Sequence, residues 1–195
     1  AKTGVYGTPR FMAPEIVTGK AKPSRNTDLF SLAVLLFYMF MLNHPLEGRR
    51  EARIKCMDIH AMNMLYGTDP LFIFDPDNKD NRPLAGYQDN ALIFWDLYPQ
   101  QLRELFTTSF TVGLGQPIRR STEGKWMETF ANLMSGIMLC PNCGSEVFYD
   151  AQKEESGAAH TCWGCQKAVT VPPKIVIGKS TVLLMSNTKL YRHHI

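Results

Sequence analysis

The stretch that decides the fold is LFSLAVLLFYMFML, residues 29–42, which is apolar on every face of a helix. Asn26, Thr27 and Asp28 precede it and are suited to cap a helix N-terminus, and the Asn-His-Pro sequence at 43–45 ends it. A helix that is apolar all round lies in a membrane or at the centre of a helical domain. With about four turns it is shorter than the roughly 20 residues of a membrane span. We therefore predict a buried central helix and no membrane association.

Helical patterns continue outward from this stretch, and a different pattern begins after Leu139. The further helical segments are residues 49–66, 90–98, 99–112 and 121–138. The segments that indicate loops are residues 1–23 and 69–82. The strand-like runs of the tail are residues 175–177, 181–185 and 190–191. The predicted fold is mainly α over 1–139, followed by a small β module over 140–171 and a short β tail over 172–195.

Composition excludes several classes of protein. Hydrophobic residues make up 45% of the chain and charged residues 20%, which is typical of a folded globular protein. The net charge of +3 is too small to indicate nucleic-acid binding. No charged-then-apolar leader follows Ala1, so we expect a cytoplasmic, reducing environment. The sequence does not begin with Met, so we expect a chain cut from a longer protein.

Two Cys-x-x-Cys pairs predict a metal site. Cys140 and Cys143 form the first pair, and Cys162 and Cys165 form the second pair after 18 intervening residues. Four thiolates in two such turns match a tetrahedral structural zinc site, and short strands beside them predict a zinc ribbon. Disulfides are disfavoured by the reducing environment, and a redox motif needs only one pair.

Two other residues, a histidine near this site and a further cysteine, are predicted not to bind the metal. His160 is predicted to lie at the surface, because four cysteines already saturate the metal. Cys56 is predicted to be a small core residue of the helix over 49–66. The ribbon is acidic, which disfavours nucleic acid and leaves a protein as its possible partner; its acidic residues are Glu146, Asp150, Glu154 and Glu155.

Four motifs in the helical part resemble a protein kinase, in kinase order. GTPRFMAPE at 7–15 resembles the end of an activation segment, with the Ala-Pro-Glu motif at 13–15. DLFSLAV at 28–34 resembles the Asp-x-Trp-Ser-x-Gly motif that opens the central helix of the large lobe. NHPLEG at 43–48 resembles the turn that follows this helix, and RSTEGKW at 120–126 resembles the late Arg-Pro-Thr-x-x-x-Trp segment.

The resemblance implies roles for individual residues. It implies that Thr8 lies beside the catalytic aspartate and helps select a Ser or Thr acceptor, and that Asp28 accepts hydrogen bonds from the catalytic-loop backbone. It implies that Glu15 pairs with Arg120, with Arg119 as the neighbouring alternative. The alternative interpretation is that Glu15 and Arg120 do not pair and are two solvated charges at the surface. The activation-segment and substrate-positioning residues are Thr3, Gly7, Thr8, Ala13, Pro14 and Glu15, with Thr3 as a possible activating phosphorylation site.

Departures from the family pattern indicate a divergent branch. Phe30 stands in place of Trp, Ala33 in place of Gly and Ser121 in place of Pro. The stretch 66–83 resembles an insert in a bacterial kinase-like group whose kinase lobe is followed by other modules. The resemblance therefore indicates a bacterial-type Ser/Thr kinase with a protein substrate.

The phosphate-binding parts of a kinase are absent from this sequence. It contains no Gly-x-Gly-x-x-Gly, no His-Arg-Asp and no Asp-Phe-Gly motif. We therefore expect ATP and Mg²⁺ to bind only in a full-length parent protein, and this part alone to be inactive. The alternative is a pseudokinase scaffold that recruits a partner through the zinc ribbon.

Overall fold

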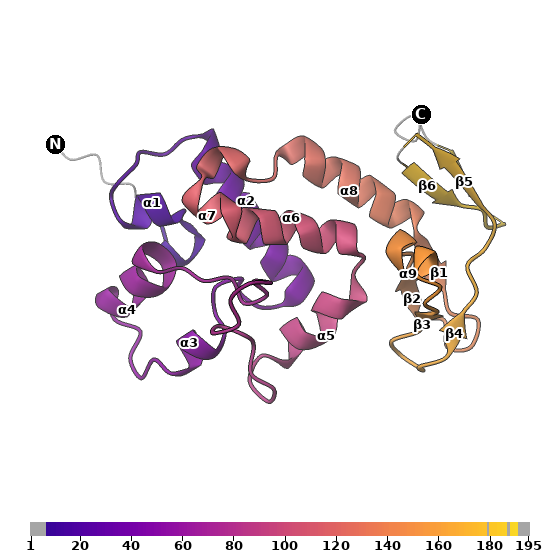
Figure 1. Ribbon diagram of the computed structural model, residues 1–195, viewed down its shortest axis with the longest axis horizontal. Helices are drawn as coiled ribbons and strands as arrows, with labels where there is room; N and C mark the ends of the chain where they lie inside the picture. Colours follow the sequence, from indigo (N-terminus) through magenta and orange to yellow (C-terminus); the bar gives the residue numbers. More distant parts are fainter. Residues whose placement is uncertain (1–6, 179, 187, 191–195) are drawn as a thin grey trace. The chain divides into compact units, whose positions relative to one another are not determined.

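The computed structural model describes residues 7–178, 180–186 and 188–190, and it divides into two compact units (Figure 1). The first unit contains the described residues up to Trp95 and residues 104–123. The second unit contains residues 96–103 and the described residues from Gly124 onward. Helices dominate and small antiparallel strand pairs follow them near the C-terminus, so the predicted fold class is confirmed.

Eleven helical segments precede the strands in the described part of the chain. These are η1 (Pro9–Phe11), α1 (Pro14–Val17), α2 (Arg25–Met41), α3 (Arg49–Ala52), α4 (Ile59–Asn63), the π-helix η2 (Met64–Thr68), α5 (Asp89–Leu97), α6 (Gln100–Phe110), α7 (Val112–Gly115), η3 (Pro117–Arg119) and α8 (Glu123–Ser135).

Helix α2 is the predicted central helix, and its ends follow from local chemistry. The Ser24 hydroxyl accepts a hydrogen bond from the Thr27 backbone N–H, and the Thr27 hydroxyl accepts one from the Ser24 N–H, which forms a capping box. At the other end Leu42 adopts a left-handed conformation with φ of 49°. Phe37 is fully buried and makes edge-to-face contacts with Phe72, Phe106 and Phe110, so the helix lies in an aromatic core.

One face of α2 is exposed, and the prediction of burial on every face is wrong there. Leu35, Tyr38, Met39 and Leu42 are between 38% and 64% exposed. Their spacing of three and four residues places them on one stripe of the helix. The first unit therefore presents an apolar strip that the described residues do not cover.

The predicted helix over 49–66 is broken in the structure. Helix α3 ends at Ala52, a loop follows, and α4 begins at Ile59, where the Asp58 carboxylate caps the Ala61 N–H. Cys56 lies in this loop and is exposed, so its interpretation as a core residue is wrong. Helix α4 continues into η2, whose wider turn carries Tyr66 into a buried position.

The loop over 69–82 is irregular, as predicted, but it contributes to the core. Phe72, Ile73 and Phe74 are buried. Asn81 is fully buried, and its amide donates hydrogen bonds to the carbonyls of Leu46 (2.9 Å) and Leu71 (2.6 Å). These bonds fix the insert to the turn that follows α2.

Gly48 allows this close approach, and a larger side chain should disrupt it. A Cβ atom at Gly48 would lie 1.9 Å from the backbone oxygen of Asn81. We expect Gly48→Ala to lower the free energy of unfolding by about 3 kcal/mol, because a backbone atom must move. Gly124→Ala is the control, because nothing lies within 4 Å of its added Cβ and alanine favours the helix. Urea unfolding of both variants measures the difference, and equal stability would contradict the assigned packing.

The second unit is built on short strand pairs. The pairs are β1 (Ile137–Leu139) with β2 (Glu146–Phe148), β3 (His160–Thr161) with β4 (Ala168–Val169), and β5 (Lys174–Ile177) with β6 (Ser180–Leu183), with α9 (Ala151–Glu155) between β2 and β3. Helix α8 ends at Ser135, before the predicted 138, because residues 137–139 form β1. A run at 190–191 was expected as a strand; Leu190 lies in no strand, and Tyr191 is outside the described residues.

A small apolar core joins the strand pairs to the tail. Met138, Val147 and Val169 are buried together with Cys140 and Cys162. Leu183 of β6 belongs to the same cluster. The β5–β6 hairpin therefore shares its packing with the cysteine-rich strands.

Candidate functional site

Glu15 and Arg120, 105 positions apart, meet in the first unit. Arg120 donates from Nη1 to Oε1 of Glu15 (2.7 Å) and from Nη2 to Oε2 (2.8 Å), which is a bidentate pair. The guanidinium also donates to the carbonyls of Gly113 (2.9 Å) and Asn26 (2.8 Å). Arg120 is only 2% exposed, whereas Arg119 is exposed. The predicted pair therefore forms through Arg120, and the interpretation as solvated charges is wrong.

The other predicted kinase positions lie near the start of the described chain. Ala13 and Pro14 are buried at the N-terminus of α1, where proline suits the first helical position. Gly7 and Thr8 are exposed before η1, and Asp28 is exposed in the first turn of α2. Thr3 lies outside the described residues.

A hydrogen-bonded network beside Thr8 was not predicted from the sequence. The carboxylate of Glu47 accepts a hydrogen bond from Arg10 Nη2 (2.5 Å) and another from the Tyr66 hydroxyl (2.6 Å). His44 is fully buried, and its Nε2 lies 2.7 Å from the carbonyl of Arg10. The network ties the segment after Thr8 to the turn that follows α2. The Pro-containing motif at 43–48 predicts this turn, but nothing in the motif predicts that Glu47 pairs with Arg10 and Tyr66.

His44 should make stability depend on pH. Burial lowers the pKa of His44 to about 4, and Nδ1 accepts from the Leu46 N–H, so the folded ring is neutral. In the unfolded chain the pKa is about 6.5, so between these values only the unfolded state binds the proton. The neutral ring of His44 therefore contributes to the free energy of unfolding in full above pH 6.5. About 3 kcal/mol of this contribution is lost as the pH falls toward 4. Urea unfolding at pH 7 and at pH 4.5 measures this loss of stability. The His44→Gln variant should lose less stability between the two pH values than the wild type. Equal losses in the two proteins would contradict a buried neutral ring.

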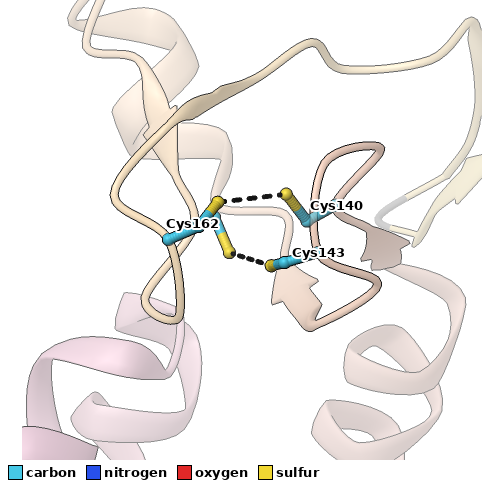
Figure 2. Close-up of side chains that lie close together, drawn as sticks. Cys140, Cys143 and Cys162 are labelled. Carbon is cyan, nitrogen blue, oxygen red and sulfur yellow. Dashed lines mark hydrogen bonds between the residues drawn. The ribbon is translucent and has the colours of Figure 1, made fainter.

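The four predicted cysteines converge in the second unit, as Figure 2 shows for Cys140, Cys143 and Cys162. Their four sulfur atoms lie within 4.8 Å of one another. The Cys140–Cys165 sulfurs are 3.6 Å apart and the Cys143–Cys162 sulfurs 3.5 Å apart. Sulfurs bound at 2.3 Å around a tetrahedral metal would be about 3.8 Å apart. The donor set and its spacing therefore fit one metal ion.

The two turns support thiolate ligation. In the first turn the Cys140 N–H donates to the Ser145 carbonyl (2.9 Å), and in the second the Cys162 N–H donates to the Lys167 carbonyl (2.9 Å). Hydrogen bonds with Ser145, through its hydroxyl and then its backbone, lower the pKa of Cys143 to about 6. At Cys162 the hydrogen bond from the Cys165 backbone lowers the pKa, but burial and the Cys143 sulfur together outweigh it and raise the pKa to about 11. A thiolate is the form that binds metal.

His160 is buried, so its prediction as a surface residue is wrong. It is 4% exposed, and its Nε2 accepts a hydrogen bond from the Asp150 N–H (2.9 Å). Its ring stacks on Tyr149, with centroids 5.6 Å apart. Lys174 of β5 donates to the Tyr149 hydroxyl (2.9 Å) and pairs with Glu154, so the hairpin contacts the same cluster.

Comparison with known protein families matches residues 1–116 to the protein kinase domain. This match covers more than half of the chain, and the chain belongs to the protein kinase domain family. The chain is also similar to protein kinase C-like 1 of Candida albicans, with 51% identity over 45 residues. That alignment covers 23% of this chain and 4% of the relative, so the chain spans a small part of its length.

Family membership supports a kinase-related function. None of the helices in the described ranges has the length and apolarity needed to cross a bilayer.

Proposed function

We propose that this chain is the latter part of the large lobe of a Ser/Thr protein kinase that transfers the γ-phosphoryl group of ATP to protein. The observation that carries the proposal is the partly buried bidentate pair of Glu15 with Arg120, formed between the two motifs for which the kinase resemblance implies it. In this assignment Gly7, Thr8 and residues 13–15 position the protein substrate. The resemblance of residues 66–83 favours a bacterial-type kinase.

The catalytic residues belong to a longer parent protein in this proposal. The sequence carries none of the motifs by which kinases bind ATP and Mg²⁺. Two observations support further kinase residues beside the first unit: the exposed strip of α2, and the exposed carboxylate of Asp28. Asp28 would accept hydrogen bonds from the catalytic-loop backbone.

The four cysteines hold zinc in this proposal. A tetrahedral all-thiolate site with no open position is structural, and the metal would supply folding free energy to strands too short to fold alone. We assign residues 1–139 to the kinase part, 140–171 to a zinc ribbon and 172–195 to a β tail. The ribbon would bind a protein partner in the cytoplasm, since its acidic residues disfavour nucleic acid.

Calorimetry and a transfer assay test the kinase assignment. The 195-residue chain should show no ATP binding at micromolar concentrations, whereas the full-length parent should bind ATP and label a protein on Ser or Thr. Micromolar affinity in the chain alone would contradict the placement of the phosphate-binding parts outside it. A full-length protein that binds no ATP and transfers no phosphate would favour a pseudokinase scaffold with the ribbon as recruiting module.

A further inference from the structure

A cavity of about 550 Å³ opens in the first unit beside the segment that contains Thr8. Its volume is within the range of sites that bind small molecules. Its polar lining includes Thr8, Arg10, Glu47, Glu51, Tyr66 and Tyr87. The cavity therefore brings two carboxylates together at the edge of the proposed substrate-positioning segment.

The two carboxylates differ in how well they are compensated. Glu47 accepts short hydrogen bonds from Arg10 and Tyr66, and the Arg10 charge balances its own. Among the described residues, the Glu51 carboxylate accepts a hydrogen bond from the Tyr87 hydroxyl alone, at a long distance of 3.4 Å. Burial, and then the charge of Glu47, raise the pKa of Glu51. With Arg10 and Glu47 paired, the cavity carries one uncompensated negative charge when Glu51 is ionised.

The remaining walls suit a cation with an apolar stem. Met57 and Met62 line the cavity, and their thioether side chains adapt to irregular shapes. Tyr66 and Tyr87 also line it, and a guanidinium or ammonium is attracted to the face of an aromatic ring. An anionic ligand is disfavoured, because it would face both Glu47 and Glu51.

We propose that this cavity receives an arginine or lysine side chain of the protein substrate, and that Glu51 determines this specificity. The inference rests on the proposed kinase function and deepens it, because Thr8 lines the same cavity and marks the acceptor position. The basic residue therefore lies within a few residues of the phosphorylated Ser or Thr. The Glu51 carboxylate binds the incoming cation, and the tyrosine and methionine walls contact its stem.

Peptide binding without ATP tests the specificity directly. Fluorescence anisotropy would compare labelled Ser-containing peptides that carry arginine with matched peptides that carry neutral citrulline at the same position. The wild-type chain should bind the arginine peptide about tenfold more tightly, as expected for a charge-assisted hydrogen bond. Glu51→Gln should remove this preference, because glutamine keeps an acceptor for Tyr87 but not the charge. Equal binding of the two peptides by the wild type would overturn the proposal.

Matched variants separate the cavity from general charge and folding effects. Glu128→Gln removes the same charge from an exposed position on α8 and should keep the arginine preference. Glu51→Lys should invert the preference toward a glutamate peptide, which a merely unfolded variant would not do. Loss of the preference in Glu128→Gln, or no change in either Glu51 variant, would contradict the assignment.

Two further measurements identify the source of the cation and test the cavity independently of the kinase function. N-acetylarginine amide should compete at least tenfold more weakly than the arginine peptide; equal competition would indicate a free small cation and overturn the substrate assignment. A full-length protein that phosphorylates arginine and citrulline peptides equally would refute the cavity proposal and leave the kinase function intact. Arginine-selective binding in a protein that transfers no phosphate would refute the kinase function alone.

Discussion

Arg120→Ala should lower the free energy of unfolding of the first unit by about 3–5 kcal/mol, since it leaves the partly buried charge of Glu15 without its partner. The loss extends beyond the ion pair, because the same guanidinium donates to the carbonyls of Gly113 and Asn26. It also lies over the ring of Phe30, 5.1 Å from the centroid. One side chain thus joins α1, the start of α2 and α7, and urea unfolding of the variant measures the loss.

Arg119→Ala is the matched control for this prediction. Arg119 is exposed beside Arg120, so its removal should change stability by less than about 0.5 kcal/mol. Glu15→Gln and the double variant complete a cycle that isolates the coupling between Glu15 and Arg120. A coupling near zero, or equal losses from both arginine variants, would contradict the pair.

The sequence was sufficient to predict features that depend on motifs or on long periodic runs. The apolar content of residues 29–42 predicted α2, but the cap expected at residues 26–28 is wrong, because α2 begins at Arg25 and Ser24 caps it. The meeting of Glu15 with Arg120 was predicted only through the family resemblance, because no local pattern joins positions so far apart. The exposed face of α2 was not predicted, because an all-apolar helix gives no sign of which side its own chain covers.

The unpredicted features depend on tertiary contacts. The break between α3 and α4 and the π-helix that follows bring Tyr66 to Glu47, and a helical pattern over 49–66 contains no sign of either. For His160 a signal was available in the strand alternation. Cys162, which is fully buried, directly follows β3, and a two-residue step along an extended chain places His160 on the same side as Cys162. Saturation of the metal by four cysteines does not determine whether a neighbouring side chain is buried.

Removal of metal should unfold the cysteine-rich strands and leave the first unit folded. Each strand there has two or three residues, and two of the six buried residues of the small core are proposed ligands, Cys140 and Cys162. Thiolate ligation contributes on the order of 10 kcal/mol in small zinc modules, which exceeds what such a core provides. The aromatic core around Phe37 contains none of the four cysteines and should be unaffected.

Amide hydrogen exchange with and without a chelator measures this effect at specific bonds. The N–H groups of Cys140 and Cys162, bonded to the carbonyls of Ser145 and Lys167, should lose protection. The β5–β6 hairpin should lose protection too, because Leu183 packs in the same small core. Unchanged protection after chelation, or well under one zinc per chain by elemental analysis, would contradict a structural zinc site.

Cys143→Ser should reproduce the effect of the chelator, and Cys56→Ser should not. Both substitutions replace an exposed thiol by a hydroxyl, but only Cys143 is close to the other three sulfurs. Serine is a poor zinc ligand at neutral pH because its hydroxyl stays protonated, so the Cys143 variant loses one of four bonds to the metal. We therefore expect lower zinc content and faster exchange in the ribbon only for Cys143→Ser. Equal behaviour of the two variants would show that the four cysteines cluster without holding a metal that the fold needs.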